Sequence, residues 1–401
     1  MILTVLAFAG LSAGAAVAEA ENAFAIVGAR IYASPDAALI ENGVILMRGD
    51  RIAAVGPDSA VRVPRNARKL DVHGGTVVAG FWNSHVHLMT PGLLEATAKP
   101  KDALSASLRD MLTHWGFTTV FDIASPLANT EALRHRIQVG EVTGPKILTV
   151  GDPFFPEGGT PYYVQDFYRE NHIPSSEVAT PATAAARAAR QLDTGADGVK
   201  LFTGAIVGGK IDVLPMRLDI AKAIVDEAHR RGKPAFSHPS NAAGLDIAID
   251  SGVDILAHTT PPSGPWGPGL LRRMRAHDMA LIPTLGLFAD AGVNMDAPLQ
   301  QVKAYSDAGG QILFGTDIGF TNAFDTTEEY RLMSRALTWR QILASLTTAP
   351  AKRFGWAAHK GRVAAGLDAD LVVLDTDPAT DSTAFAKVRN TIRAGRVIYV
   401  Q

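Results

Sequence analysis

His85 and His87 stand one residue apart at the end of the apolar stretch GFWNSHVH, residues 80–87. Side chains alternate along a β-strand, so the two imidazoles are expected to point to the same side. Two imidazoles on one side can bind a single metal ion. An HxH pair is weak evidence by itself, so the interpretation depends on the residues that follow along the chain.

Further titratable residues stand in or directly after later apolar runs. Active sites of (β/α)8 barrels are built at the C-terminal ends of the strands. If these runs are barrel strands, six side chains converge on one face: His85, His87, Lys200, His238, His258 and Asp317. Each alone could be structural, as a hydrogen-bonded core histidine, an ion-paired lysine or a capping aspartate. We disfavour that reading because it must hold independently at five strand ends.

Lys200 is the unusual member of this set, because a cationic ammonium group would repel metal ions. Burial of an unpaired charge is costly, and it lowers the pKa of a lysine and favours the neutral amine. A neutral amine can react with carbon dioxide to give a carbamate, which is an anionic oxygen ligand. A carbamate on Lys200 could bridge two metal ions.

Short apolar runs alternate with amphipathic stretches through the middle of the chain. Helices are expected at 184–192 and 219–231, and strands at 76–82, 118–122, 146–150, 198–202, 234–237, 254–257, 280–283 and 311–315. Eight such β/α units predict an α/β fold, a (β/α)8 TIM barrel over residues 76–355.

Both ends of the chain show a different pattern of short β-like runs separated by Gly and Asp, for example at 43–47 and 396–400. This pattern favours antiparallel sheet. We therefore predict a small β-sandwich domain formed by residues 21–75 and 356–401, which brings the two ends together.

Residues 1–20 resemble a signal peptide, since residues 2–17 are apolar and uncharged and two small-x-small sites follow at 16–18 and 18–20. The absence of Lys and Arg from the first residues is atypical. We expect cleavage and export to the periplasm or the extracellular space. The alternative is a buried N-terminal helix or strand in a cytoplasmic protein. No other stretch is apolar and long enough to span a bilayer.

The amino-acid composition limits the partners and the metal ligands that the chain can use. The 401 residues include 38 Lys and Arg, 40 Asp and Glu, and no Cys. The balanced charge and the absence of a basic run give no reason to expect nucleic acid as a partner. Without cysteine there is neither a disulfide nor a thiolate ligand, so metal ligands must come from His, Asp, Glu or a modified Lys.

Taken together, these motifs resemble the amidohydrolase superfamily. The resemblance rests on the HxH pair, the lysine of strand four, the two later histidines, the aspartate of strand eight and the C-terminal run GRVAAGLDADLVVL, residues 361–374. It covers nearly the whole mature chain and is closest to imidazolonepropionase-like and prolidase-like members. Asn83 departs from the family pattern, in which many members carry Asp, but that position is not a metal ligand there.

The resemblance implies a binuclear centre. His85, His87 and Asp317 would hold one metal ion, His238 and His258 the other, and carboxylated Lys200 would bridge both. True imidazolonepropionases hold one metal and lack this use of lysine, so Lys200 argues against that activity. Zinc is the default, while manganese, cobalt and iron stay open.

The implied function is a metal-dependent hydrolase that cleaves the C–N amide bond of a small molecule, such as a dipeptide or an N-acyl amino acid. A hydroxide that bridges the metals would attack the carbonyl, with Asp317 as general base and then general acid. A lactone, cyclic amide or phosphoester hydrolase with the same centre is the alternative, and a solute-binding protein that kept the fold is a third reading. Members of this family often associate, so a homo-oligomer stays open.

Two further expectations concern residues around the centre. Asp122, at the end of strand two, could orient a ligand histidine or form a structural ion pair. Aromatic and proline residues of two loops could line an apolar substrate pocket or only pack the loops: Phe154, Phe155, Tyr162 and Tyr163 after strand three, and Pro261, Pro262, Trp266 and Pro268 after strand six.

Overall fold

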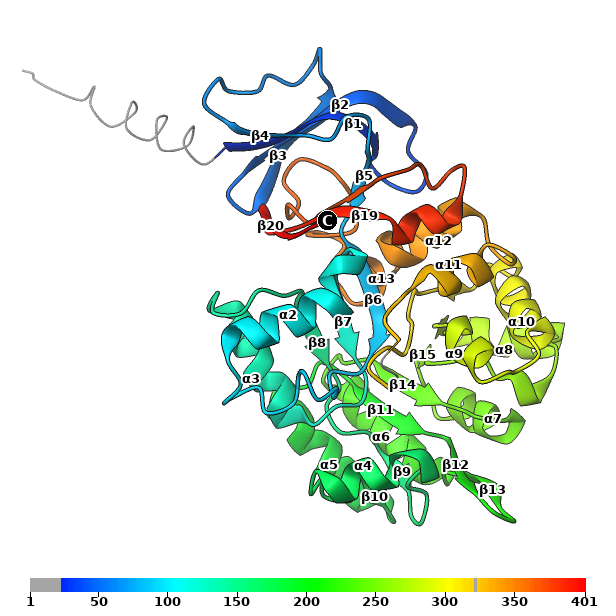
Figure 1. Ribbon diagram of the computed structural model, residues 1–401. Coiled ribbons are helices and arrows are strands. Elements are labelled where there is room, and N and C mark those ends of the chain that lie inside the picture. The colour runs from blue at the N-terminus through cyan, green and yellow to red at the C-terminus, as the bar shows by residue number, and fades with distance from the viewer. Residues whose placement is uncertain (1–22, 321–322) are drawn as a thin grey trace, which may run out of the picture.

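The computed structural model describes residues 23–320 and 323–401. A mixed β-sheet lies at the top of Figure 1, and a larger α/β part lies below it. The expected signal peptide, residues 1–20, lies outside the described residues. In the described part, no helix is both long enough and apolar enough to cross a membrane.

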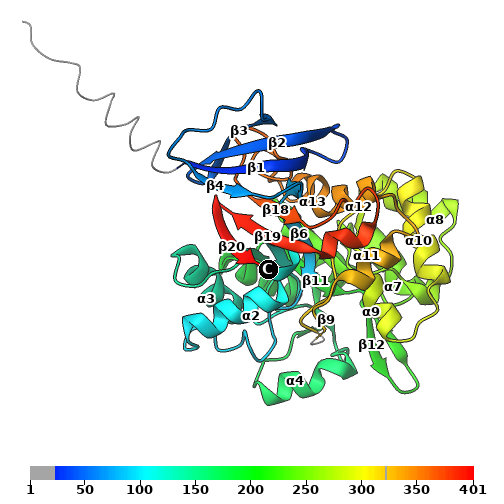
Figure 2. The same ribbon diagram turned by 45° about the horizontal axis from the view of Figure 1, so that its top comes forward.

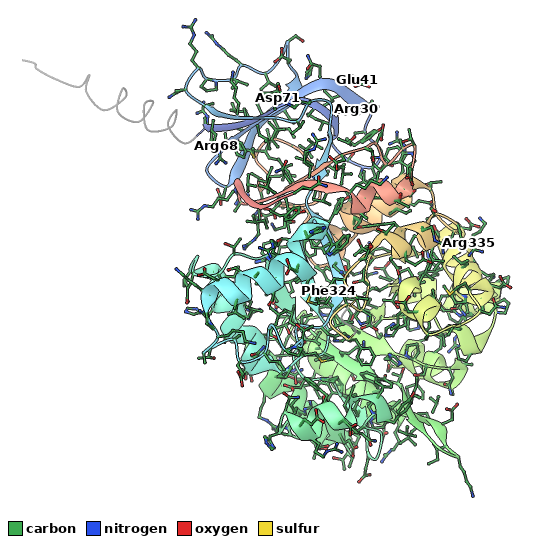
Figure 3. The ribbon with its side chains drawn as sticks, in the orientation of Figure 1. Arg30, Glu41, Arg68, Asp71, Phe324 and Arg335 are labelled. Atoms are coloured by element: carbon green, nitrogen blue, oxygen red, sulfur yellow. The ribbon has the colours of Figure 1, made fainter. Side chains whose placement is uncertain are left out.

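The terminal segments meet in one eight-stranded sheet with the order β20-β19-β18-β5-β1-β2-β3, in which β4 pairs with β1. Its strands are β1 (Ala23–Tyr32), β2 (Leu39–Arg48), β3 (Arg51–Pro57), β4 (Arg68–Asp71), β5 (Thr76–Ala79), β18 (Leu371–Leu374), β19 (Val388–Arg393) and β20 (Arg396–Val400). At its surface, Arg30 on β1 lies 3.6 Å from Glu41 on β2 (Figure 3). The ends of the chain share a sheet as expected, but the β-sandwich is not confirmed, because the strands pair into one mixed sheet.

One predicted strand, residues 76–82, is two strands in the structure. β5 pairs with β18 in the mixed sheet, whereas β6 (Phe81–Val86) pairs with β7. The break falls at Gly80, where a Cβ atom would lie 2.3 Å from Thr118 Oγ1. Glycine therefore permits the close approach at which the chain passes from one sheet to the next.

The remaining predicted barrel strands form two parallel sheets. One has the order β6-β7-β8 and the other β11-β14-β15-β16-β17. Besides β6, the strands of these two sheets are β7 (Phe117–Asp122), β8 (Lys146–Thr149), β11 (Val199–Phe202), β14 (Ala235–His238), β15 (Ile255–Leu256), β16 (Ala280–Leu281) and β17 (Gln311–Ile312). The ladders do not close into one barrel, although main-chain bonds such as Ser84 N to Phe314 O and Phe154 N to Lys200 O cross the two seams.

Helices surround these parallel strands, as the two views show (Figures 1 and 2). They are α2 (Lys101–Met111), α3 (Leu127–Gln138), α4 (Gln165–Glu170), α5 (Pro181–Asp193), α6 (Leu218–Arg230), α7 (Ala242–Asp250), α8 (Pro268–Ala276), α9 (Leu285–Asp290), α10 (Asp296–Asp307), α11 (Thr327–Met333), α12 (Trp339–Leu346) and α13 (Thr348–Arg353). Two short pairs complete the fold, β9 (Phe155–Pro156) with β10 (Glu177–Val178), and the hairpin β12 (Gly204–Gly208) with β13 (Asp212–Pro215).

An apolar cluster lies where the parallel strands face one another. Trp82, Phe121 and Phe236 come from three different strands, and Phe354 packs against all three rings. Their burial fills the space between the strands on one side. The polar ends of the same strands then lie on the other side, where the candidate site is found.

Candidate metal centre

His85, His87 and Asp317 form a compact cluster of possible metal ligands. Asp317 Oδ1 lies 3.0 Å from His85 Nε2 and 2.6 Å from His87 Nε2, and the two Nε2 atoms are 3.3 Å apart. One ligand atom from each residue lies within 4.8 Å of the others. The expectation that the two imidazoles point the same way is confirmed.

The second nitrogen of each imidazole bonds to a main-chain carbonyl. His85 Nδ1 lies 2.9 Å from Ala257 O, and His87 Nδ1 lies 3.2 Å from Ala124 O. A carbonyl only accepts, so each Nδ1 must carry the hydrogen and each Nε2 must present a lone pair. This is the tautomer in which histidine binds a metal through Nε2.

The lone pairs of this cluster converge without a hydrogen between them. Asp317 Oδ1 is buried and has no hydrogen bond of acceptable geometry, despite the two imidazole nitrogens beside it. A carboxylate oxygen and two imidazole lone pairs repel one another unless a cation lies between them. Nitrogen and carboxylate donors are the ligands that Zn²⁺ takes, so these residues fit a divalent metal ion.

The other three predicted ligands lie beside this cluster. The His258 ring centroid is 4.7 Å from that of His85 and 4.6 Å from that of His238, and His258 Nε2 lies 3.8 Å from Asp317 Oδ2. Lys200 is only 1% exposed and stands on β11, next to the strand that ends in His238. All six residues border one cavity, so the structure brings the predicted set together.

Burial dominates the protonation of the centre. It lowers the pKa of His85 to about 4 and that of His238 to about 3, which leaves both imidazoles neutral at physiological pH. It also lowers the pKa of Lys200 to about 7, with Asp317 acting in the opposite direction.

Lys200 has no carboxylate within ion-pairing distance among residues 23–320 and 323–401. Its ammonium nitrogen lies 5.4 Å from the centre of the Phe202 ring, which is a weak substitute for an anion. A buried ammonium group without a counter-ion is costly. The environment therefore favours the neutral amine, as the sequence predicted.

Among residues 23–320 and 323–401, Asp122 forms no ion pair and no direct hydrogen bond to a ligand histidine, so the ion-pair alternative is not found and any effect on a histidine is indirect. Its carboxylate accepts hydrogen bonds from the hydroxyls of Ser125, Thr130 and Thr149 and from the main-chain N–H of Leu88. It thereby ties together the segments that follow β6 and β7 and the end of β8. Leu88 directly follows His87, so Asp122 acts on the centre through the main chain.

Thr284 and Glu329 support the centre, and the sequence analysis missed both. Thr284 lies in the left-handed region with φ 48°, and its Oγ1 lies 2.8 Å from His258 Nδ1. Glu329 is 3% exposed and accepts hydrogen bonds from Leu285 N at 3.0 Å and Gly286 N at 2.6 Å. Thr284 directly follows the predicted strand at 280–283, so the strand-end reasoning could have found it, whereas nothing in the sequence singles out Glu329.

A cavity of about 440 Å³ opens over the centre. The aromatic loops contribute to it in part: Phe155, Tyr163, Pro261 and Pro262 line the cavity, whereas Trp266 is 2% exposed and packs against Tyr305. Both alternatives for these loops therefore hold, for different residues. The loop and helix residues that the sequence analysis did not single out, such as Phe167, Phe288 and Phe320, complete the wall.

Comparison with known proteins identifies the family of the chain. The model described as the amidohydrolase family matches residues 76–398. That match spans most of the chain, and the chain therefore belongs to the amidohydrolase family, as its motifs predicted. Amidohydrolase TasK of Hapsidospora irregularis is 34% identical over 102 residues, which are 24% of this chain and a tenth (10%) of that protein.

Solved structures of hydrolases share the fold over 94% of the chain. A Xaa-Pro dipeptidase with methionine in its active site has a TM-score of 0.79, 19% identity and 100% coverage of its own chain. A prolidase complexed with N-methylphosphonate-L-proline has a TM-score of 0.78, 23% identity and 100% coverage. Molinate hydrolase has a TM-score of 0.77, 19% identity and 94% coverage. At these identities the likeness shows the fold alone.

Proposed function

We propose that the protein is a binuclear metal-dependent amidohydrolase that cleaves the C–N amide bond of a small molecule, such as a dipeptide or an N-acyl amino acid. The observation that carries the proposal is the position of Asp317. Its buried Oδ1 lies against two imidazole lone pairs with no hydrogen between them, at the floor of a cavity. A binding protein would have no need of a general base such as Asp317.

In this proposal His85, His87 and Asp317 hold one metal ion and His238 and His258 the second, while Lys200, carboxylated on Nζ, bridges them. Zinc is the default metal for these ligands. When bound, two divalent ions polarise a scissile carbonyl and lower the pKa of water between them.

The chain supplies the proton transfer through Asp317. Its Oδ1 faces His85 and His87, whereas its Oδ2 faces His258, with 3.8 Å between Oδ2 and His258 Nε2. Oδ2 is therefore the oxygen that accepts the proton of the attacking water. It then returns that proton to the amine that leaves, as general base and general acid in turn.

The remaining sequence predictions belong to the same proposal. They are a closed (β/α)8 barrel, export directed by residues 1–20, and a small molecule as the partner. The buried main-chain bonds across both strand seams support the barrel.

The test is amine release from a panel of dipeptides, N-acyl amino acids and the carboxamides of both by zinc-loaded protein in bicarbonate buffer. Asp317→Asn is the control, and it is expected to lose about 10²–10⁴-fold in kcat while it stays folded by circular dichroism. Near-normal turnover by that variant would contradict the role of Asp317. No release by wild-type protein with two metals bound per chain would redirect the proposal to lactones, cyclic amides or phosphoesters.

A further inference from the structure

The wall of the cavity is apolar around a polar floor. Beyond the six residues of the centre, aromatic and aliphatic side chains from several separate segments surround the space, among them Phe155, Phe167, Ile206, Leu287, Phe288 and Phe320. The volume of about 440 Å³ lies within the range of pockets that enclose small organic ligands. A ligand in this cavity therefore contacts hydrocarbon on most of its surface.

No cation of the wall is available to a ligand. Lys200 is the only Lys or Arg among the described residues that line the cavity, and it belongs to the centre. Behind the wall lies the guanidinium of Arg187 on α5, which contacts Pro153 of the lining. It donates hydrogen bonds to the carbonyls of Pro153 and Ser176 and lies 4.3 Å from the Phe154 ring. The main chain therefore occupies its donors.

Most polar groups of the wall are also committed to the protein. Ser240 Oγ donates to Gly204 O at 2.7 Å, and Tyr168 OH lies 3.1 Å from Ser176 Oγ. Asp152 places a further carboxyl group on the wall, and burial raises its pKa. An ionised carboxylate on a ligand would meet no counter-charge on this wall.

We propose that this site selects uncharged amides with apolar groups on both sides of the scissile bond, and that it discriminates against substrates with a free carboxylate. The inference rests on the proposed amide hydrolysis and narrows it, because free dipeptides and N-acyl amino acids become poor substrates. Burial of an unpaired carboxylate is costly, whereas a carboxamide of the same shape carries no charge.

The test compares two ligands that differ only in that charge. N-benzoyl-L-phenylalanine and N-benzoyl-L-phenylalaninamide share the benzoyl–nitrogen bond, and benzoate release reports its cleavage in both. We expect kcat/KM to be at least about tenfold higher for the carboxamide. Equal values, or a preference for the acid, would overturn the inference and leave amide hydrolysis intact. Cleavage of neither compound, nor of any other amide, would overturn the proposed function itself.

Substitutions at Phe320 test whether charge, rather than the shape of the cavity, determines the preference for the carboxamide. Phe320 is 38% exposed at the cavity and its ring lies 5.3 Å from that of Tyr163. Phe320→Arg introduces a cation there and should raise kcat/KM for the acid relative to the carboxamide by about tenfold. Phe320→Leu is the matched control and should leave the ratio unchanged. If Phe320→Arg leaves the ratio of kcat/KM for the acid and the carboxamide unchanged, the lack of a cation on the wall is not the cause of the selectivity.

Discussion

The Nδ1 atom of His258 lies 2.8 Å from the hydroxyl oxygen of Thr284. That oxygen also lies 2.9 Å from Pro283 O, to which it must donate its single hydrogen. Thr284 Oγ1 therefore accepts from His258 Nδ1–H, which leaves a lone pair on His258 Nε2. This hydrogen bond determines which nitrogen of His258 faces Asp317 and the proposed second metal.

Thr284→Val is predicted to weaken metal binding without unfolding the protein. Valine keeps the shape of threonine but cannot accept from His258, so the imidazole loses its fixed tautomer. Loss of such a partner costs about 10–100-fold in metal affinity or activity. Metal content after dialysis against graded zinc concentrations, together with kcat/KM, measures the effect.

Thr284→Ser is the matched control for that prediction. Serine retains the hydroxyl and tolerates the left-handed backbone at this position as well as threonine does. It should keep both metal content and activity close to those of the wild type. Equal metal affinity in the valine and serine variants would refute the role of the hydroxyl.

Glu329 holds the turn in which Thr284 lies. Its two carboxyl oxygens accept from successive main-chain N–H groups, those of Leu285 and Gly286, at the start of α9. Burial nevertheless raises the pKa of Glu329 to about 7, with the two N–H bonds acting in the opposite direction. The carboxyl group therefore resists ionisation in the folded state more than in the unfolded chain.

The raised pKa of Glu329 predicts a pH-dependent stability. Its contribution is fully present below the unfolded pKa of about 4.3 and is lost as pH rises through about 7. Glutamine at this position does not titrate. The unfolding free energy of the wild type minus that of Glu329→Gln should therefore fall by about 3 kcal/mol between pH 4.5 and pH 7.5.

Urea unfolding of both proteins across this pH range, at one zinc concentration, measures that difference. Because both proteins share every other titrating group, contributions from the metal ligands cancel in the subtraction. A difference that stays constant with pH, or that rises, would show that the N–H bonds of Leu285 and Gly286 keep Glu329 ionised in the folded state.

The centre was predictable from the sequence because strand ends are a local signal. Each of the six residues lies within an apolar run or within a few residues of its end, and parallel strands bring their C-terminal ends to one side. The alternation of side chains correctly placed His85 and His87 together. The family match and the compact cluster with Asp317 agree with that reasoning.

What the sequence did not reveal depends on contacts between distant residues. The break at Gly80 depends on the approach of Thr118, and the role of Asp122 depends on hydroxyls from α3 and β8. Likewise, the support from Thr284 and Glu329 joins segments that are 45 residues apart in sequence. None of these partners has a fixed spacing, so no pattern along the chain could predict them.

Lys200 provides the sharpest test of the binuclear centre. Its amine would add to carbon dioxide, forming a nitrogen–carbon bond and releasing one proton, and the resulting carbamate would be the bridging ligand. Lys200→Ala removes this anion and should reduce bound metal from two ions to one or fewer per chain, with loss of activity. Metal analysis of protein purified with zinc and bicarbonate measures the change.

Short carboxylic acids should partly restore metal content in Lys200→Ala, because acetate or propionate can enter the space that the side chain leaves and supply the missing oxygens. Lys146→Ala is the matched control: Lys146 is also partly buried and its pKa is also lowered by burial, but it lies on β8 against Trp356, outside the centre. It should keep the metal content of the wild type. Two metal ions in Lys200→Ala without added acid would mean that the carbamate is not a ligand, since His85, His87, His238, His258 and Asp317 would then suffice.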